Sequence, residues 1–450
     1  MTQPQPQQQS FADQIDDRDI PAIQESLMAM TTVDVADEMS RSDTSEQAFL
    51  FRLLDKDRAL QVFEYLDVAH QAELIDELRE GHYADLLLSL PDDDRAQLLG
   101  EMPANVAAKM MADLPPERRS VTARLLGYPE ESAGRVMTPV PTTIAESNTR
   151  QQALAKLRGR ELRNRDIAVI AVVDETRHLV GVVDLAKLVS AADDVLVGDL
   201  MNEETHAVSA TQDQEVAARL IQEADLLALP VVDEENRFLG VITVDDAMEI
   251  LESEVTEDVY RSGGSEPLNQ PYLSATVFHL ARKRGVWLLV LILTAVLTVN
   301  VMSFFEDTLA AVVVLATFVP MITGTGGNAG SQAASSVVRA LAVDEVRPRD
   351  IWRVIWREVR VGMLLGLFLG ALIFPFISLI YEWRIGAVMS LSIILICMWA
   401  CIVGGVLPLV ARKIGVDPAV FSTPVVSTLV DATGLIIYFT IAQIILASML

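Results

Sequence analysis

The segment STLVDATGLIIYF, residues 427–439, lies inside an apolar run that extends from residue 418 to residue 450. Asp431 is the only charged residue of that run, which is long enough to cross the ~30 Å hydrocarbon core of a bilayer. An ionised side chain at that depth is costly, so it usually faces the interior of a helix bundle or a water-filled cavity. Ser427 and Thr428 precede Asp431 by one turn and Thr423 by two, which makes a polar stripe on one side of the helix. The segment predicts a membrane helix with a functional carboxylate; an Asp that only bonds to Ser and Thr and holds helices together is the alternative.

Five apolar segments of spanning length follow one another in the second part of the chain, at about 285–305, 309–341, 361–381, 386–411 and 419–449. Basic residues gather before the first segment, between the second and third, and between the fourth and fifth. Because cytoplasmic loops carry the excess of Lys and Arg, this pattern predicts a five-helix transmembrane domain, residues 285–450, in the cytoplasmic (inner) membrane. The first part of the chain is then cytosolic, and the C-terminus lies outside.

The second apolar segment contains an unusual stretch, PMITGTGGNAGSQAASSVVRAL, residues 320–341. Its first eleven residues hold four glycines and a proline, which favours an unwound backbone, and such a backbone survives at membrane depth only where it is buried or lines water. Pro424 and Gly434 bracket Asp431 in the same way, so two interrupted spans are expected to line an ion path. The expected lining residues of the second span are Gly324, Gly327 and Asn328. The alternative is a close crossing of helices through small residues.

The residue types around Asp431 indicate which ion such a path would carry. A carboxylate among hydroxyl and carbonyl oxygens is a hard-oxygen site, which favours Mg²⁺, Ca²⁺ or Mn²⁺ over zinc or copper. Mg²⁺ keeps several of its waters, so a few outer oxygens suffice, and a two-fold dimer would bring two Asp431 side chains to one axis. The two cysteines, Cys397 and Cys401, have no neighbouring His and predict neither a zinc site nor a disulfide.

The net negative charge of the chain comes entirely from its first part. Residues 263–450 hold 10 acidic and 12 basic residues, which leaves 52 of the 62 acidic and 23 of the 35 basic residues to residues 1–262. A body this acidic repels phosphates, so no nucleic acid partner is expected. It attracts divalent cations instead.

Residues 41–131 are predicted to form a helical superhelical domain. Short helical units recur at intervals of about a dozen residues, as in LPDDDRAQLLGEM (90–102) and PPERRSVTARLL (115–126), each with Pro or Asp at its start. Such units bury one face each by stacking on their neighbours. Residues 1–40 are expected to be a disordered or polar tail, since MTQPQPQQQS is Gln-rich and has no apolar core of a signal peptide.

Residues 132–243 contain an internal duplication. AVIAVVDETRHLVGVVDLAKLV (168–189) is repeated as LALPVVDEENRFLGVITVDDAMEIL (227–251), with Gly181 and Gly240 in equivalent places. Each copy predicts a strand, a polar turn, a second strand and a helix. The pair resembles tandem α/β CBS domains, which implies a regulatory module that senses adenosine nucleotides or ions. The second copy has the ribose-binding run from Gly240 to Asp246, whereas the first has Lys187 in place of the acid, which leaves ATP binding open.

An acidic connecting region, residues 244–284, follows the duplication. The helix VDDAMEILESEVTEDVYR (244–261) places several acids three or four residues apart on one face, which costs free energy in an isolated helix. Divalent ions that bridge these acids to others are one interpretation, and a solvated acidic face is the other.

The order of these domains, together with GTGGNAGSQ (324–332) and VDATGLIIY (430–438), resembles the MgtE family of Mg²⁺ channels and transporters. The resemblance implies a homodimer in the lipid membrane, a pore lined by the second and fifth spans, and recognition of hydrated Mg²⁺ by Asp431. It also implies that the acidic helix is a plug for that pore. Regulatory Mg²⁺ is implied at Asp93, Asp213, Glu215, Asp225, Asp246, Glu249, Glu254, Glu257, Asp258 and Asp417.

These features together predict a magnesium-selective channel that imports Mg²⁺ and closes when cytosolic Mg²⁺ binds between the acidic surfaces. A secondary carrier for Mg²⁺, Co²⁺ or Mn²⁺ is the alternative, although a single intramembrane carboxylate offers no proton relay. A membrane-anchored nucleotide sensor that transports nothing is a third hypothesis. No nucleophile motif or phosphate loop is present in the sequence, so no enzyme is expected.

Overall fold

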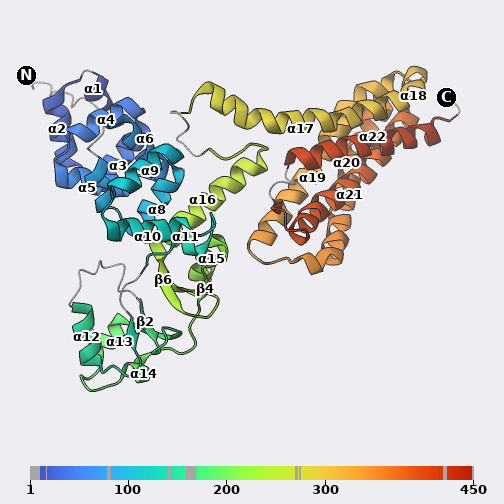
Figure 1. Ribbon diagram of the computed structural model, residues 1–450. Helices are drawn as coiled ribbons and strands as arrows, with labels where there is room; N and C mark the ends of the chain where they lie inside the picture. Colours follow the sequence, from blue (N-terminus) through green and yellow to red (C-terminus); the bar gives the residue numbers. More distant parts are fainter. Residues whose placement is uncertain are drawn as a thin grey trace, which may run out of the picture. The chain divides into compact units, whose positions relative to one another are not determined.

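The computed structural model describes residues 11–16, 18–78, 83–139, 143–158, 169–268, 272, 275–418 and 423–447. The chain forms two compact units. The first contains Met1–Glu254 and Asn269–Ala275, and the second contains Val255–Leu268 and Thr276–Leu450. Figure 1 colours the chain from blue at the N-terminus to red at the C-terminus.

The first unit begins with a stack of short helices (Figure 1, blue to cyan). In the described residues these are α1 Phe11–Asp16, α2 Ile20–Ala29, α3 Thr32–Arg41, α4 Thr44–Leu53, α5 Lys56–Tyr65, α6 Val68–Glu77, α7 Tyr83–Ser89, α8 Asp92–Glu101, α9 Ala104–Asp113 and α10 Pro116–Leu126. Helices α4, α5 and α6 each have an aspartate cap whose carboxylate accepts hydrogen bonds from N–H groups of the first turn: Asp43, Asp55 and Asp67. These caps repeat every twelve residues, which confirms the predicted spacing of the helices.

The expected polar tail is wrong for residues 11–40. Three helices form there, and Ile23 and Met39 are completely buried in the same core as Leu74. Apolar residues four positions apart, such as Val35 and Met39, give each short helix one buried side. Helices this short are unstable alone and form because they pack on their neighbours, a contact that composition does not reveal. Residues 1–10 lie outside the described residues.

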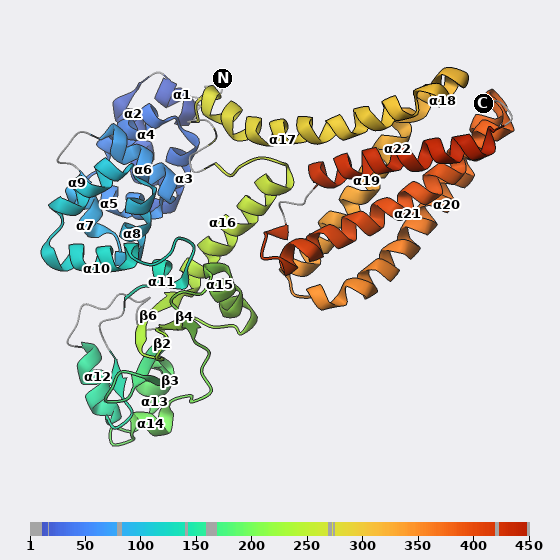
Figure 2. The same cartoon turned by 45° about the vertical axis from the view of Figure 1, so that its right-hand side comes forward.

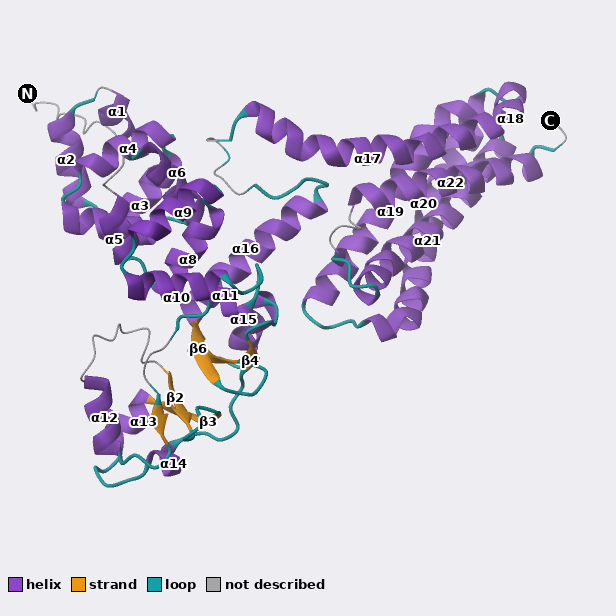
Figure 3. Ribbon diagram, viewed as in Figure 1, coloured by secondary structure: helices purple, strands orange, loops and turns teal. Residues whose placement is uncertain are grey.

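The duplication forms two small sheets, drawn in orange in Figure 3. The first is β1 Ile144–Ala145, β2 Val169–Val173 and β3 Leu179–Asp184; the second is β4 Val208–Ser209, β5 Ala228–Val232 and β6 Phe238–Thr243. In each, the first pair of strands is parallel and the second antiparallel. The helices of this region are α11 Ala133–Val136, α12 Arg150–Arg158, α13 Leu185–Ser190, α14 Val197–Leu200 and α15 Gln214–Glu223. The predicted strand, turn, strand and helix order is confirmed in both copies.

The two copies are interlocked through their glycines. A β-carbon on Gly240 would lie 2.5 Å from the carbonyl oxygen of Thr138, and one on Gly181 would lie 2.7 Å from that of Asn202. Thr138 precedes the first copy but pairs with β6 of the second, whereas Asn202 precedes the second copy and pairs with β3 of the first. Each glycine therefore admits the backbone segment that precedes the other copy.

The connecting helix α16, Val244–Ser262, follows β6 directly. The second unit then contains α17 Val277–Phe304, α18 Glu306–Ala311, α19 Val314–Ala342, α20 Ile351–Ile380, α21 Trp383–Lys413 and α22 Thr423–Ile445. Helices α19, α20, α21 and α22 form a bundle, and α17 lies along α22 (Figure 2). The core of this bundle includes Val388, Ile396, Val430 and Tyr438.

Among the described residues, four helices are long and apolar enough to cross a membrane: Val277–Phe304, Pro348–Ile380, Trp383–Lys413 and Pro424–Ile445. Helix α19 has 29 residues but is too polar to belong to this set. It packs on α21 and α22, and eleven of its residues are buried. The five predicted segments thus appear as five long helices, four of which are apolar by themselves.

The predicted breaks in the second and fifth spans are wrong. Helices α19 and α22 both run without interruption through their glycines. A β-carbon on Gly326 would lie 2.8 Å from Cγ2 of Ile396, and one on Gly330 would lie 3.0 Å from Cγ1 of Val426. The glycines therefore permit α21 and α22 to pack closely against α19, which is the predicted alternative of a helix crossing through small residues. Helical hydrogen bonds satisfy the backbone inside the bundle, so no unwinding is needed.

Candidate functional site

Asp431 lies on the side of α22 that faces α19. Its carboxylate is half-buried, and a β-carbon on Gly327 would lie 3.5 Å from its Oδ1 atom. The same β-carbon would overlap Oγ of Ser427, one turn earlier on α22. The structure thus brings together three of the predicted pore residues, Asp431, Ser427 and Gly327. Only a glycine leaves room at position 327 for both oxygen-bearing side chains.

Two further predicted pore residues lie on a side of α19 that the described residues of the second unit leave uncovered. Gly324 and Asn328 are exposed, and a β-carbon on Gly324 would meet no atom within 4 Å. They are four residues apart and share one face. The hydroxyl of Thr428 is directed elsewhere, because it donates a hydrogen bond of 2.9 Å to the carbonyl of Pro424. Thr423 begins α22, but its side chain lies outside the described residues.

In the first unit, the structure brings Asp93 of α8 close to Asp246 of α16. Asp93 is buried, and its carboxylate accepts a hydrogen bond from the hydroxyl of Thr138. Asp246 accepts hydrogen bonds from the hydroxyl of Thr243, at 2.5 Å, and from its N–H, at 3.2 Å. Burial raises the pKa of both carboxyl groups, that of Asp246 to about 7, and the charge of Asp93 also raises the pKa of Asp246. Two crowded carboxyl groups of this kind hold a proton readily and favour a cation beside them.

A second acidic cluster lies at the beginning of α15. Asp213 caps this helix by accepting a hydrogen bond of 2.7 Å from the N–H of Glu215. Glu254 of α16 accepts a hydrogen bond of 3.0 Å from the side chain of Gln214, which lies between Asp213 and Glu215 in the sequence. Glu215 in turn accepts a hydrogen bond of 3.0 Å from Nε of Arg219. Three predicted ligands, Asp213, Glu215 and Glu254, therefore gather at one helix terminus.

Asp225, Glu249 and Asp258 occupy other positions on and after the two helices. Asp225 follows the far end of α15, in a left-handed conformation with φ of 51°. Glu249 is an exposed residue of α16, and Asp258 is half-buried nearer the end of that helix. Across the residues that the structure describes, no group of three or more Asp, Glu, His or Cys side chains is arranged to hold a metal ion. The predicted acids of one chain thus form partial sites, and whether they bind Mg²⁺ remains a prediction.

Glu257 and Asp417 are joined by a residue that the sequence pattern did not assign to any site. Arg261 makes an ion pair with Glu257 through Nη2 and a second one with Asp417 through Nη1. The spacing of Glu257 and Arg261 on one helix could have indicated the first pair. Nothing local connects position 261 with position 417, so the second pair follows only from the fold.

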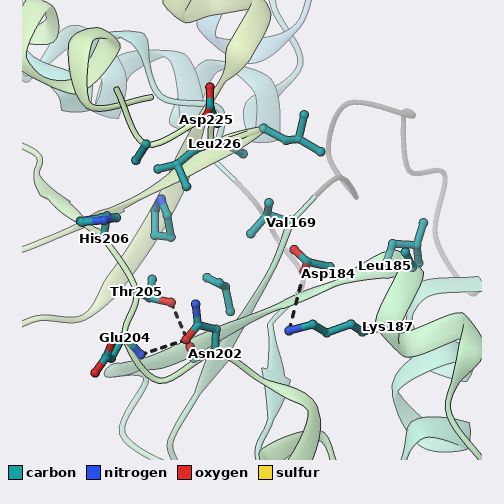
Figure 4. Close-up of a pocket in the computed structure, with 16 residues that line it drawn as sticks. Val169, Asp184, Leu185, Lys187, Asn202, Glu204, Thr205, His206, Asp225 and Leu226 are labelled. Atoms are coloured by element: carbon teal, nitrogen blue, oxygen red, sulfur yellow. Dashed lines mark hydrogen bonds and ion pairs between the residues drawn. The ribbon is translucent and has the colours of Figure 1, made fainter. Parts of the chain in front are cut away.

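A pocket of about 780 Å³ lies within the duplicated region (Figure 4). Asp184 and Lys187 line it from the end of the first copy, and Asp225 and Leu226 line it from the second. Nζ of Lys187 lies 4.0 Å from the carboxylate of Asp184. The segment from Asn202 to His206 forms another wall, where the hydroxyl of Thr205 donates to the carbonyl of Asn202. The pocket thus adjoins the motif in which Lys187 replaces the acid.

Family models match the chain in three regions. The MgtE intracellular N domain matches residues 30–131, the CBS domain matches residues 133–194 and 197–253, and the MgtE divalent cation transporter domain matches residues 319–441. The predicted CBS pair is confirmed by these matches and by the sheets.

Curated proteins give the same result. The chain is 40% identical over 331 residues to the magnesium transporter MgtE of Thermus thermophilus, which covers 74% of each chain. It is 35% identical over 320 residues to the magnesium transporter MgtE of Bacillus subtilis, covering 71% of this chain and 70% of that one. A crystal structure of the cytosolic domain of the Mg²⁺ channel MgtE in complex with ATP is 30% identical, with a TM-score of 0.48, and covers 54% of this chain and 98% of that chain.

A relative that is 40% identical over about three quarters of both chains, and family models that follow one another from residue 30 to residue 441, establish the family. The chain is a multi-pass membrane protein with cytosolic N-terminal domains, and it is a transport protein and not an enzyme. It belongs to the MgtE family of magnesium transporters.

Proposed function

We propose that this protein is a magnesium-selective channel that imports Mg²⁺ across the cytoplasmic membrane and closes when cytosolic Mg²⁺ is plentiful. The observation that supports it most is the contact of Asp431 with Gly327, which places a carboxylate and the hydroxyl of Ser427 on one side of the α19–α22 pair. A half-buried carboxylate in a membrane helix is stabilised by a passing cation. Hydrated Mg²⁺ suits this site, because a few oxygens outside its water shell suffice.

The same site supports a homodimer. Gly324 and Asn328 are left uncovered on α19, on a membrane helix too polar to face lipid. A second copy related by a two-fold axis would cover this face and bring a second Asp431 towards the first. The two carboxylates would repel each other, and each divalent ion that enters offsets that repulsion. With five membrane helices and cytosolic N-terminal domains, the C-terminus lies outside.

The acidic clusters of the first unit support closure by Mg²⁺. Asp93 with Asp246, and Asp213 with Glu215 and Glu254, collect negative charge from α8, α15 and α16. Mg²⁺ bound there would offset this charge and hold the helices together, and α16 then closes the ion path as a plug. When cytosolic Mg²⁺ falls, repulsion between the acids separates the helices and the path opens.

The decisive experiment is Mg²⁺ flux into proteoliposomes, with Asp431→Asn as the test variant. The amide keeps the shape of the side chain but removes its charge, so flux is expected to fall to the level of empty liposomes. Asp307→Asn is the matched control, because Asp307 is an exposed carboxylate at the start of α18. Unchanged flux in Asp431→Asn would reject the proposal and leave the membrane-anchored sensor as the alternative.

Regulation is tested on the same proteoliposomes by varying internal Mg²⁺. Asp213→Asn combined with Glu254→Gln removes two charges from the cluster at α15 and is expected to raise the internal Mg²⁺ needed for closure. An unshifted closing concentration would contradict the gating part of the proposal. Single-channel currents in a patch distinguish a channel from a secondary carrier for Mg²⁺, Co²⁺ or Mn²⁺.

The pocket of the CBS pair supports adenine nucleotide, such as ATP, as a second ligand. Its volume of about 780 Å³ lies within the range of small-molecule sites, and it lies at the end of the first ribose-binding motif. Asn202, Thr205 and His206 bring polar groups to its wall. Lys187 stands where an acid would hold the ribose, so the proposal includes weaker binding than an intact motif would give.

A further inference from the structure

Arg261 connects two segments that are far apart in the sequence. It lies in the last turn of α16 and contacts Glu257 on the same helix and Asp417 between α21 and α22. All three residues belong to the second unit. The side chains are 34%, 20% and 30% exposed for Arg261, Glu257 and Asp417. Ion pairs shielded to this degree are stronger than those in open solvent, and those of a guanidinium fork are also directional.

The backbone fixes the places of Arg261 and Asp417. Helix α16 ends at Ser262 and is followed by Gly264, with φ of 67°, and the N–H of Ser265 donates to the carbonyl of Tyr260. Helix α21 ends at Lys413 and is followed in the same way by Gly415, with φ of 77°, where the N–H of Val416 donates to the carbonyl of Ala411. Both patterns are Schellman motifs, which favour glycine at the left-handed position. They place Arg261 just before one turn and Asp417 just after the other.

The chemistry of the junction is that of two carboxylates with a cation between them. The resemblance to the family implies a Mg²⁺ role for both Glu257 and Asp417. Here a guanidinium of this chain contacts both, with one nitrogen for each carboxylate. Glu257 precedes Arg261 by four residues, the favourable order on a helix, and a basic residue near a helix C-terminus is also favourable.

We propose that Arg261 is the resident cation of this junction, so that the end of α16 is held to the segment before α22 without a divalent ion. This proposal deepens the proposed function, on which its regulatory meaning rests. It divides the acids of α16 into two groups. Those near its beginning respond to Mg²⁺, whereas Glu257 at its end remains attached through Arg261. The end of α16 is then a fixed pivot for the opening of the ion path.

Hydrogen exchange of the backbone amides of residues 255–262 tests the junction directly, in the full-length protein in detergent. In the natural protein, exchange is expected to be equally slow in EDTA and in millimolar Mg²⁺. In Arg261→Gln, exchange in EDTA should be about tenfold faster, the effect of losing hydrogen bonds between charged groups. Mg²⁺ should slow it again, because Glu257 and Asp417 no longer contact Arg261 and the ion can take its place between them. A side chain with only a packing role would not give this rescue.

Three variants complete the test. The double variant Arg261→Gln with Asp417→Asn should exchange fast with and without Mg²⁺, because Glu257 is then the only carboxylate of the pair. In EDTA, the effects of the two substitutions on the exchange rate should not add. Arg261→Lys keeps the positive charge but not the two-nitrogen guanidinium fork, so its exchange rate in EDTA should lie between those of the natural protein and Arg261→Gln. Arg282→Gln removes an exposed charge of α17 and should exchange like the natural protein.

The proposal is overturned if exchange in the natural protein is fast in EDTA and slowed by Mg²⁺, or if Arg261→Gln changes nothing. Additive effects of the Arg261 and Asp417 substitutions would overturn it as well. None of these results depends on ion flux. Failure of the proposed function would appear instead as normal Mg²⁺ flux in Asp431→Asn, so the failures of the two proposals are distinguishable.

Discussion

A β-carbon placed on Gly327 of α19 would lie 3.5 Å from the carboxylate oxygen of Asp431 on α22 and would overlap Oγ of Ser427. A β-carbon placed on Gly324, three residues earlier, would meet no atom within 4 Å. Two glycines of one stretch therefore have different roles. Gly327 allows α19 and α22 to meet at the carboxylate, whereas Gly324 lies on the uncovered side.

Gly327→Ala is expected to destabilise the membrane domain and to reduce Mg²⁺ flux. The added methyl group must displace Ser427, and overpacking of this kind costs typically about 1–3 kcal/mol. The check is the thermal midpoint in detergent together with flux in proteoliposomes. Gly324→Ala is the matched control and should keep the midpoint of the natural protein. Equal midpoints for the two variants would contradict the contact.

The buried pair of Asp93 and Asp246 predicts that the cytosolic unit loses stability as the pH rises. The pKa of Asp246 rises from 3.8 to about 7 on folding, so the folded protein retains a proton that the unfolded chain releases. The contribution of this pair to stability in EDTA should therefore be largest below about pH 4, fall as the pH rises to about 7, and then level off. Calorimetry of the full-length protein at several pH values measures this fall.

Asp246→Asn gives the control for this pH dependence. The amide resembles the protonated acid and carries no charge at any pH, so the fall between about pH 4 and 7 should become smaller. Added Mg²⁺ should restore stability above pH 7 in the natural protein and have less effect in the variant. A pH profile that is the same in both proteins would show that this pair is not the cause.

Gly240→Ala is expected to disturb the contact between the second CBS copy and the segment around Thr138. A β-carbon there would lie 2.5 Å from the carbonyl oxygen of Thr138, a backbone atom that cannot move aside cheaply. Because the hydroxyl of Thr138 donates to Asp93, the N domain should be loosened as well. A loss of about 1–3 kcal/mol is expected, measured by calorimetry.

Gly198→Ala is the matched control for Gly240→Ala. Gly198 lies in α14, and its β-carbon would lie 3.4 Å from the carbonyl oxygen of Glu146, a tolerable contact. Alanine also favours a helix over glycine, so the melting temperature should stay the same or rise slightly. A fall as large as that of Gly240→Ala would show that any added methyl group in this region is harmful.

Lys187→Asp is expected to strengthen adenine nucleotide binding in the CBS pocket. The carboxylate would restore the acid that accepts hydrogen bonds from the ribose, worth about tenfold in affinity. Isothermal titration with ATP, ADP and AMP measures the effect, and Lys187→Ala controls for the loss of the amine alone. Equal affinities of the two variants, or no binding by either, would contradict nucleotide as the ligand.

The sequence alone determined the features that depend on neighbouring residues. The five spans, the two copies with their glycines and the isolated charge of Asp431 are visible because hydrophobicity and strand patterns are local. The repeated aspartate caps of the N domain are local as well, since a cap bonds only to the first turn of its own helix.

Tertiary structure decided what depends on distant partners. Whether the glycines of 324–330 unwind or pack could not follow from composition, because it depends on Ile396 and Val426 of two other helices. The helices of residues 11–41 form only against the rest of their core. The meeting of Asp93 with Asp246, and of Arg261 with Asp417, joins residues more than a hundred positions apart, and only the packed fold brings such charges within reach of each other.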